Sequence, residues 1–355
     1  MPAQKPSGRT RGADTKRQLV ASAAELFLRR GYPQVSLADI ARSAGVTAPS
    51  VYRHFDDKQA LLEAAVLAGV DELEACTERA LADGAGTDEL IASVCTLGVQ
   101  RPQAASLWRW TSNYLTVEQN KQVALRTREV IGKWASALAD GRDDLTDREA
   151  VQLAWASLSV CGSLTVHHSR MSAARAREEL EKMIRRVVAL RPASAPALDV
   201  AAPVAAVTAT RRDEILDAAA ELFAARGYTD VGIDEIGAAV GIAGPSVYKH
   251  FPSKLAILVG IGQRSAMWLE AGVIASFAAT SDPAKLLALL IDSYVTVITS
   301  TTDLSVAFNS STAMRGQSGA AELLDIQRRY VARWIDLLIQ VDPGLRRDQG
   351  AVAVH

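Results

Sequence analysis

Apolar residues recur every three or four positions along most of the chain, which is the spacing of one face of an α-helix. The first such stretch runs from about Thr15 to Arg30, and its shared apolar face consists of Leu19, Ala23, Leu26 and Phe27. Gly31 follows directly, and glycine is typical of a helix end. Apolar residues make up 49% of the chain but aromatic residues only 5%, which suits helical bundles better than sheets. The pattern predicts an all-α protein.

Two short helices are predicted after the first. Ser36 and Asp39 form a capping box, in which each side chain accepts a hydrogen bond from the other residue's backbone amide. A glycine at position 45 and a short turn then lead to a proline, which is tolerated in the first turn of a helix. The third helix is predicted over Pro49–Phe55, with Val51 and Phe55 four residues apart and facing inward.

The outward side of this third helix carries candidate DNA contacts. A short second helix that supports a third, exposed one is the arrangement that places side chains in a major groove. The groove-facing candidates are Pro49, Ser50, Tyr52, Arg53 and His54. Asp57 then caps a fourth helix and brings Lys58 to its first turn, where backbone amides and an ammonium group can together hold a phosphate.

The chain contains an internal repeat. Ala24–Leu62 aligns without a gap with Ala220–Leu258, 196 residues later, and 19 of the 39 positions are identical. A weaker match at an offset of 200 pairs Trp134 with Trp334 in similar amphipathic stretches. The whole unit, and not only its head, is therefore interpreted as duplicated.

The repeat divides the chain into two tandem units, each a three-helix head on a helical-bundle body. Three prolines among alanines mark an extended linker between them. The expected parts are a disordered basic arm (1–14), a first head (15–62), a first body for ligand binding and dimerisation (63–190), the linker (191–209), a second head (210–258) and a second body (259–355). The sequence stops where the first unit begins its last two helices, so either the chain is a fragment or the second body is truncated and lacks its dimer helices.

Charge is distributed unevenly between the two heads. The chain as a whole carries a net charge of −1. Residues 1–62 hold ten Lys/Arg against five Asp/Glu, a net charge of +5, whereas residues 207–258 hold five against seven, a net charge of −2. Since phosphate attraction dominates DNA affinity, the first head is expected to carry most of it. The second head also has Gly232 and Ala243 where the first has the capping Ser36 and the hydroxyl of Thr47.

The segments AAELFLRRGY, SLADIARSAGV and GVTAPSVYRHFDDKQALL resemble the DNA-binding head of the TetR/AcrR family, and AAELFAARGY and GIAGPSVYKHFPSKLAIL repeat the resemblance in the second unit. These motifs cover about fifty residues of each unit. The resemblance implies a sequence-specific DNA-binding transcriptional regulator, a repressor that a small-molecule effector releases from double-stranded DNA. It also implies a cytoplasmic homodimer joined through the helices of residues 147–190.

The resemblance assigns site residues position by position. In the first head it implies phosphate contacts from Thr47, Ser50, Tyr52 and Lys58, and base contacts from Ala48, Pro49, Arg53 and His54. In the second head the phosphate contacts are Ser246, Tyr248 and Lys254, and the base contacts are Gly244, Pro245, Lys249 and His250.

The first body carries several tryptophans with two possible roles. If the body binds an effector, the candidate ligand contacts are Trp108, Trp110, Trp134 and Trp155. Alternatively these side chains are simply core, as large aromatic residues usually are. No polar constellation among them identifies a ligand.

The sequence argues against several other classes of protein. No nucleophile–base pair, phosphate loop or paired carboxylate indicates an enzyme, and no cofactor is expected. Three widely spaced cysteines and the adjacent His167 and His168 do not form a metal site. The uncharged run Val151–Val166 is too short to span a bilayer, so no membrane is expected. The remaining alternative is a ligand-sequestering or protein-interaction regulator whose second head no longer binds DNA.

Overall fold

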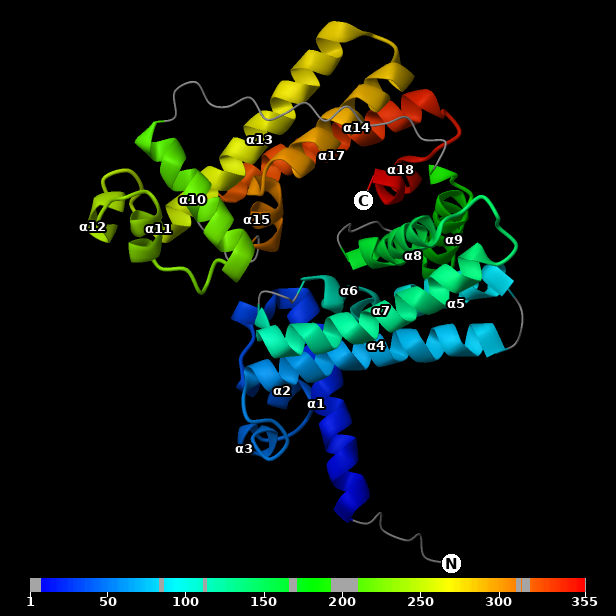
Figure 1. Ribbon diagram of the computed structural model, residues 1–355. Helices are drawn as coiled ribbons and strands as arrows, with labels where there is room; N and C mark the ends of the chain where they lie inside the picture. The colour runs from blue at the N-terminus through cyan, green and yellow to red at the C-terminus, as the bar shows by residue number, and fades with distance from the viewer. Residues whose placement is uncertain are drawn as a thin grey trace, which may run out of the picture. The chain divides into compact units, whose positions relative to one another are not determined.

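The computed structural model describes residues 8–82, 86–110, 114–165, 171–192, 210–310, 314 and 320–354. Every regular element in these ranges is a helix, so the all-α prediction is confirmed. The chain folds into two compact units that divide at Ala195 and Pro196 (Figure 1). Residues 1–7, His167 and His168 and most of the predicted linker (193–209) lie outside the described residues.

The first unit has a head of short helices and a body of longer ones. Its elements are α1 (Gly8–Arg30), the 3-10 turn η1 (Tyr32–Gln34), α2 (Leu37–Ser43), α3 (Ala48–Val51), α4 (Lys58–Ala82), α5 (Gly86–Gln100), α6 (Pro102–Trp110), α7 (Val117–Ala139), α8 (Asp147–Gly162), the 3-10 turn η3 (Ser163–Thr165) and α9 (Ala173–Val188).

The second unit repeats this order. Its elements are α10 (Arg211–Arg226), α11 (Ile233–Ala239), α12 (Gly244–Val247), α13 (Lys254–Ala279), α14 (Pro283–Ser300), α15 (Asp303–Asn309), α17 (Ala320–Val341) and α18 (Arg347–Val354). Helices α4 and α13 begin 196 residues apart, and α8 and α18 begin 200 residues apart, as the sequence alignment predicts.

The first helix is longer than predicted. The residues from Gly8 to Asp14 were expected in a disordered arm, but α1 already includes them. Since extending an existing helix costs far less than starting one, and the chain between Gly8 and Asp14 contains no proline, the helix continues past its last apolar contact. Arg17 and Asp14 form an ion pair on this extension.

The predicted capping box at the start of α2 is present. The Asp39 amide donates to Ser36 Oγ at 3.1 Å, and the Ser36 amide donates to Asp39 Oδ2 at 3.1 Å. In the second unit Gly232 has no side chain to accept this bond, but its amide still donates to Glu235 Oε2 at 2.7 Å. Half of the cap is therefore kept at α11.

The third helix is shorter than predicted. Helix α3 ends at Val51, not at Phe55, and Ala48 rather than Pro49 is its first residue. The chain still turns on to Phe55, because the amides of His54 and Phe55 both donate to the carbonyl of Val51, at 2.9 and 3.0 Å. A single carbonyl shared in this way tightens the last turn and ends the helix.

Two apolar clusters form the interior of the first unit. One lies in the head and includes Leu19, Phe27, Ile40, Val51 and Phe55, all buried. The other lies in the body, where α4, α5, α7, α8 and α9 pack together. Because α4 contributes to both clusters, the head and the body of this unit are joined by one continuous helix.

The small residues of α8 are used inside the unit. A β-carbon at Gly98 of α5 would lie 3.5 Å from Cβ of Cys161, so α5 and α8 approach closely there. Hydrogen bonding to Cys95 and burial raise the pKa of the Cys161 thiol well above its usual value. Cys161 of α8 is therefore packed against α5 inside the first unit.

The second unit joins its head to its body with a buried ion pair. Arg264 of α13 donates to both carboxylate oxygens of Asp303 in α15, at 2.6 and 2.9 Å, and to Asp217 of α10 at 2.6 Å. Asp303 is buried, so its charge depends on this bidentate partner. The first unit has alanines at positions 21 and 68, the counterparts of Asp217 and Arg264, and joins its head by α4, α6 and ring stacking instead.

Helix α14 is strongly apolar for an exposed helix. By length and composition it is the one helix among the described residues that could cross a membrane, and only 17% of its span is buried. It carries Lys285 and Asp292. Its counterpart α5 in the first unit packs against α8 and α9.

Candidate nucleic-acid interface

The first head presents its predicted contact residues on a firmly seated α3. Val51 and Phe55 are buried beneath it, and burial of side chains this large stabilises a fold by roughly 1.5–3 kcal/mol each. Thr47, Pro49 and Arg53 are exposed, and Tyr52 is 61% exposed. Ala48, Ser50 and His54 are half-buried at the edges of the same surface. The predicted inward and outward sides of this segment are therefore as the sequence analysis placed them.

The second head repeats this arrangement with closer packing. Val247 and Phe251 are buried, and Tyr248, at 54% exposed, Pro245 and Lys249 are on the surface. Ser246 and His250 are half-buried. Arg212 covers the ring of Phe251 at 4.0 Å and donates to the carbonyl of His250 at 2.8 Å, so it braces the end of the recognition segment.

The two lysines predicted to bind phosphate are held by the protein itself. Lys58 Nζ donates to the carbonyls of Tyr32 and Val35, at 3.0 and 3.1 Å, and lies 4.2 Å from the Tyr32 ring centre. Desolvation by burial lowers the pKa of Lys58. With three donors on an ammonium, one donor of Lys58 remains for a phosphate. The contact with phosphate stays a prediction.

The counterpart lysine is held more completely. Lys254 Nζ donates to the carbonyls of Tyr228, Thr229 and Val231, at 2.8, 3.2 and 2.9 Å. All three donors are used, and desolvation by burial lowers the pKa of this lysine as well. The geometry assigns Lys254 to holding the loop before α11 against the start of α13.

An acidic side chain that the sequence analysis did not single out touches the second recognition helix. A β-carbon at Gly244 would overlap the carboxylate of Asp234 and lie 3.0 Å from its Cα, so a larger residue there would require Asp234 to shift. Gly237 is similarly close, since a β-carbon there would lie 2.8 Å from the carbonyl oxygen of Ile242. The repeat alignment could have predicted this contact, because Asp234 and Gly244 together replace Ala38 and Ala48 of the first head.

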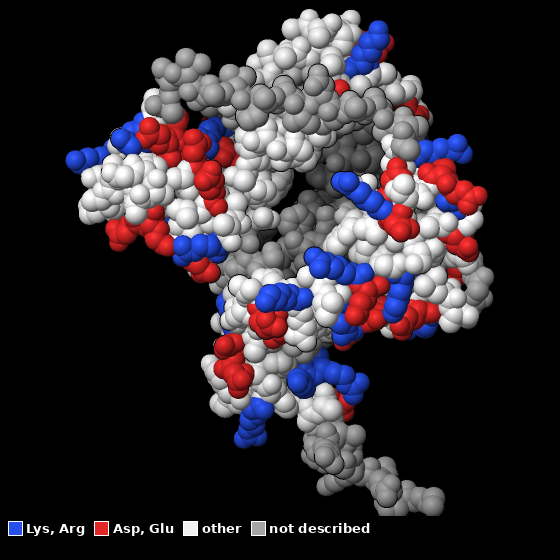
Figure 2. All heavy atoms as spheres, in the orientation of Figure 1, with Lys and Arg blue, Asp and Glu red and all other residues white. Residues whose placement is uncertain are grey.

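The surface charge differs between the heads accordingly. Figure 2 shows acidic groups around the exposed part of the second head, near α11 and α12. Asp234 and Glu235 both lie in the first turn of α11, whereas the first turn of α2 has Asp39 alone. An added carboxylate beside a recognition helix repels a phosphate backbone.

The candidate ligand-contacting tryptophans do not share one environment. Trp134 is fully buried in the core of the first body and donates from Nε1 to Thr77 Oγ1 at 3.1 Å, which is a packing role. Trp155 on α8 is 36% exposed. Trp108 and Trp110 lie on α6, but their side chains are outside the described residues. Among the described residues no group of His, Cys, Asp and Glu could hold a metal ion.

Comparison with known proteins finds the same two segments. The model of the bacterial regulatory proteins, tetR family, matches residues 19–65 and 215–261. The transcriptional activator FasR of Mycolicibacterium smegmatis is 36% identical over 84 residues, covering 24% of this chain and 38% of FasR. The regulator TtgR of Pseudomonas putida is 41% identical over 51 residues, covering 14% of this chain and 24% of TtgR.

The match thus spans well under two thirds of either curated relative. Among solved structures, a TetR-family transcriptional regulator from Bordetella parapertussis aligns over 51% of this chain and 98% of its own, with 19% identity and a TM-score of 0.42. Both family matches fall on the repeated heads, at the offset of 196 residues found in the sequence. The chain therefore carries two helix-turn-helix units in tandem, each of which matches the model of the bacterial regulatory proteins, tetR family.

Proposed function

We propose that this protein is a sequence-specific, DNA-binding transcriptional regulator and not an enzyme, and that its first head carries most of the DNA affinity. The observation that supports this most directly is the exposed surface of Thr47, Pro49, Tyr52 and Arg53 on and next to the short helix α3, above a buried Val51. The net charge of +5 on this end of the chain adds attraction for phosphate. Such a regulator works in the cytoplasm, where a bacterial chromosome is accessible.

The experiment that tests this function is selection of bound duplexes from random DNA with the purified chain. We expect one enriched sequence, and Arg53→Ala is expected to lower affinity for it by about 1–3 kcal/mol and to relax the preference at one base pair. Arg42→Ala, on the exposed end of α2, is the matched control for loss of one positive charge. Equal effects of the two substitutions, or no enriched sequence, would contradict the assignment.

The proposal includes release of the DNA by a small effector bound in the first body. Support comes from the family's architecture and from the direct joining of head and body through α4. A promoter–reporter strain distinguishes the sign of regulation: deletion of a repressor raises expression, and deletion of an activator lowers it. Repression is the outcome we propose, although FasR is named an activator.

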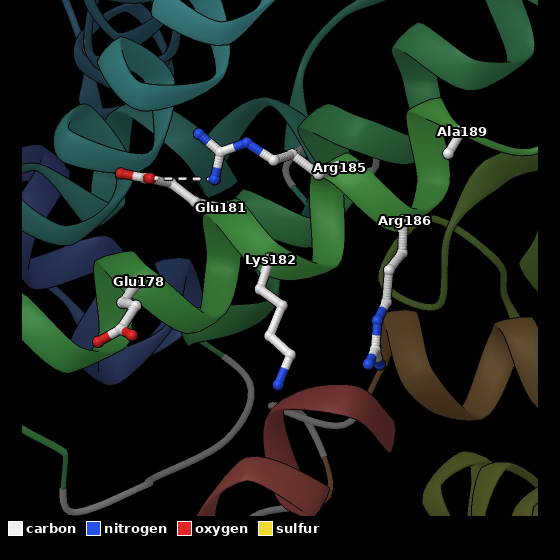
Figure 3. A pocket seen from close by; sticks show the side chains of 6 residues that line it. All are labelled: Glu178, Glu181, Lys182, Arg185, Arg186 and Ala189. Carbon is white, nitrogen blue, oxygen red and sulfur yellow. Dashed lines mark hydrogen bonds and ion pairs between the residues drawn. The ribbon is translucent and has the colours of Figure 1, made fainter.

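The first units are proposed to form a homodimer through α8 and α9. The side of α8 that faces outward carries Val151 and Trp155, both exposed apolar residues. Figure 3 shows the outward side of α9, where Lys182 and Arg186 extend away from the helix and Arg185 reaches Glu181 at 3.3 Å. An apolar strip beside a charged one is the usual composition of a dimer core and its rim. In a chain shortened to end at Ala209, Trp155→Glu is expected to give monomers in light scattering.

One observation favours a second function for the second head. The carboxylate of Asp234 packs against Gly244, the first residue of α12, in the position where the first head has Ala38 beside Ala48. This supports the alternative in which the second head has lost DNA binding and serves another contact. A gel shift with the first head disabled by Arg53→Glu separates the two cases.

A further inference from the structure

The outward face of the second half of α13 is apolar and exposed. Met267, Trp268, Ile274 and Phe277 are 67%, 54%, 65% and 52% exposed. At helical spacing Met267, Trp268 and Ile274 flank the exposed Ala271 and Ala275 within an arc of about 120°, and Phe277 lies at the edge of this face.

The first unit shows that this face is not a requirement of the fold. The positions that match Met267, Trp268 and Ile274 in α4 are Asp71, Glu72 and Glu78. There the three carboxylates form ion pairs with Arg126, Arg101 and Lys133, at 2.8, 2.6 and 2.5 Å. The same helix surface is therefore charged in one unit and apolar in the other.

An ion pair conserved in both units establishes that the comparison is in register. Glu74 and Lys133 pair at 2.9 Å in the first unit, and Glu270 and Arg333 pair at 2.6 Å at the matching positions of the second. Next to this shared pair, the Asp71–Arg126 pair of the first unit has become Met267 and Ile326. The exchange of charged for apolar side chains therefore occurs beside this shared pair, on α13 and on α17.

The exposed area is large enough for a specific contact. With roughly 200 Å² for a large apolar side chain, four of them exposed by half or more present on the order of 500 Å². This is at the upper end of the apolar patches found on monomeric proteins, and larger ones mark interaction sites. Together with the flanking alanines, it approaches the roughly 800 Å² per partner of a standard protein interface.

We infer that this face pairs with the same face of a second copy of the chain. A two-fold axis through Ala271 places Met267 opposite the partner's Ala275, and Trp268 opposite the partner's Ile274, so that large side chains meet small ones. Met267, Trp268, Ile274 and the axis lie on one side of the helix, as an isologous contact requires, whereas Phe277 lies at the edge of this side. Because the face has no formal charge, two identical copies meet without repulsion.

A membrane surface fits the same face less well. Helices that lie on membranes carry Lys and Arg beside their apolar side. From Met267 to Ala279 the single charged residue is Glu270, and it is paired with Arg333. A protein partner with the same neutral face needs no such cations.

The test is cross-linking of the full-length chain carrying Ala271→Cys, with diamide as the oxidant that takes up two electrons and two protons from a pair of thiols. A two-fold axis at this position brings the new thiol next to its own copy. We expect a disulfide-linked dimer in most of the protein. Leu324→Cys, exposed on α17, is the matched control and is expected to cross-link at least tenfold less.

A second variant keeps the test independent of the new cysteine. Met267→Asp with Ile274→Glu installs the acidic residues of the first unit, and it is expected to abolish the Ala271→Cys cross-link and to weaken self-association in sedimentation at least tenfold. Circular dichroism checks that the helices remain. Cross-linking no greater than that of Leu324→Cys in a folded protein overturns the inference. So does equal sedimentation of both proteins, or a wild-type chain that binds anionic vesicles where the double variant does not.

Discussion

A lysine that donates to backbone carbonyls stabilises the loop that those carbonyls belong to. At Lys254 the three donors hold three carbonyls between α10 and α11, and the Tyr228 ring lies 4.5 Å from Nζ. Lys58 makes the same kind of hydrogen bond, to the carbonyl of Tyr32, which lies 26 residues earlier in the sequence. Charged hydrogen bonds of this kind are worth about 1.5–3 kcal/mol where the acceptors are shielded from water.

Lys254→Ala is therefore expected to destabilise the second unit by about 1–3 kcal/mol, because three carbonyls lose their donor. Hydrogen exchange at the amides of α11 and α13 reports this unit separately from the first. Lys249→Ala, at an exposed position, is the matched control and is expected to change stability by less than about 0.5 kcal/mol. Equal exchange rates in the two variants would show that the hydrogen bonds of Lys254 contribute nothing to stability.

Asp39 gives the first head a pH dependence. Hydrogen bonds from the Ser36 hydroxyl and amide, together with Arg42, hold the pKa of Asp39 at about 2, below its usual 3.8. Since the folded pKa is the lower one, the stabilisation is fully present above about pH 4 and is lost as the pH falls through about 2. The unfolding midpoint of the wild type is expected to fall toward that of Asp39→Asn over this window. A constant difference between the two proteins from pH 5 to pH 2 would contradict it.

At the scale of helices, the features that depend on nearby residues could be predicted from the sequence, and the features that depend on tertiary contacts could not. Apolar periodicity and the capping pair Ser36 and Asp39 predicted α1 and α2, since both signals lie within a few residues of the structure they cause. The extension of α1 to Gly8 carries no apolar periodicity and was missed. The early end of α3 depends on the carbonyl of Val51, which accepts two hydrogen bonds, and no residue pattern predicts this.

The candidate site divides in the same way. Inward Val51 and outward Tyr52 follow from spacing on one short segment. The carbonyl partners of Lys58 and Lys254 lie more than twenty residues away in the sequence. The sequence alone therefore predicted that these lysines bind a DNA phosphate, and not that they donate hydrogen bonds to loop carbonyls. The overlap between Asp234 and a side chain at position 244 likewise depends on how closely α11 and α12 pack.

The Asp234–Gly244 pair leads to a prediction for the second recognition helix. Gly244→Ala alone is expected to destabilise the second head, because the added carbon overlaps the Asp234 carboxylate. Asp234→Ala with Gly244→Ala recreates the pair of the first head and removes a negative charge. In a chain with Arg53→Glu in the first head, this double variant is expected to raise affinity for duplex DNA about tenfold, measured by anisotropy at low salt. If Gly244→Ala proves as stable as the wild type, the two residues are not packed as described.

At the scale of the whole molecule, the two units are expected to do different work. The first has the basic head and the outward Val151 and Trp155 of α8. The second has an acidic head, a Lys254 whose donors are all bonded to backbone carbonyls, and the apolar face of α13. We therefore expect most of the DNA affinity and the proposed α8–α9 dimer contact in the first unit, and the proposed further contact between copies in the second.

Deletion of all residues after Ala209 is expected to leave a folded dimer that binds the selected duplex within about threefold of the full chain, since phosphate contacts in the second head contribute little. Light scattering measures the dimer and anisotropy the affinity. Trp155→Glu in the shortened chain is the matched control, and it should give monomers with weaker DNA binding, because two linked heads gain from binding adjacent half-sites. A shortened chain that is monomeric without Trp155→Glu would place the dimer contact in the second unit. A dimer that no longer binds DNA would instead place the main DNA contact in the second head, despite its charge of −2.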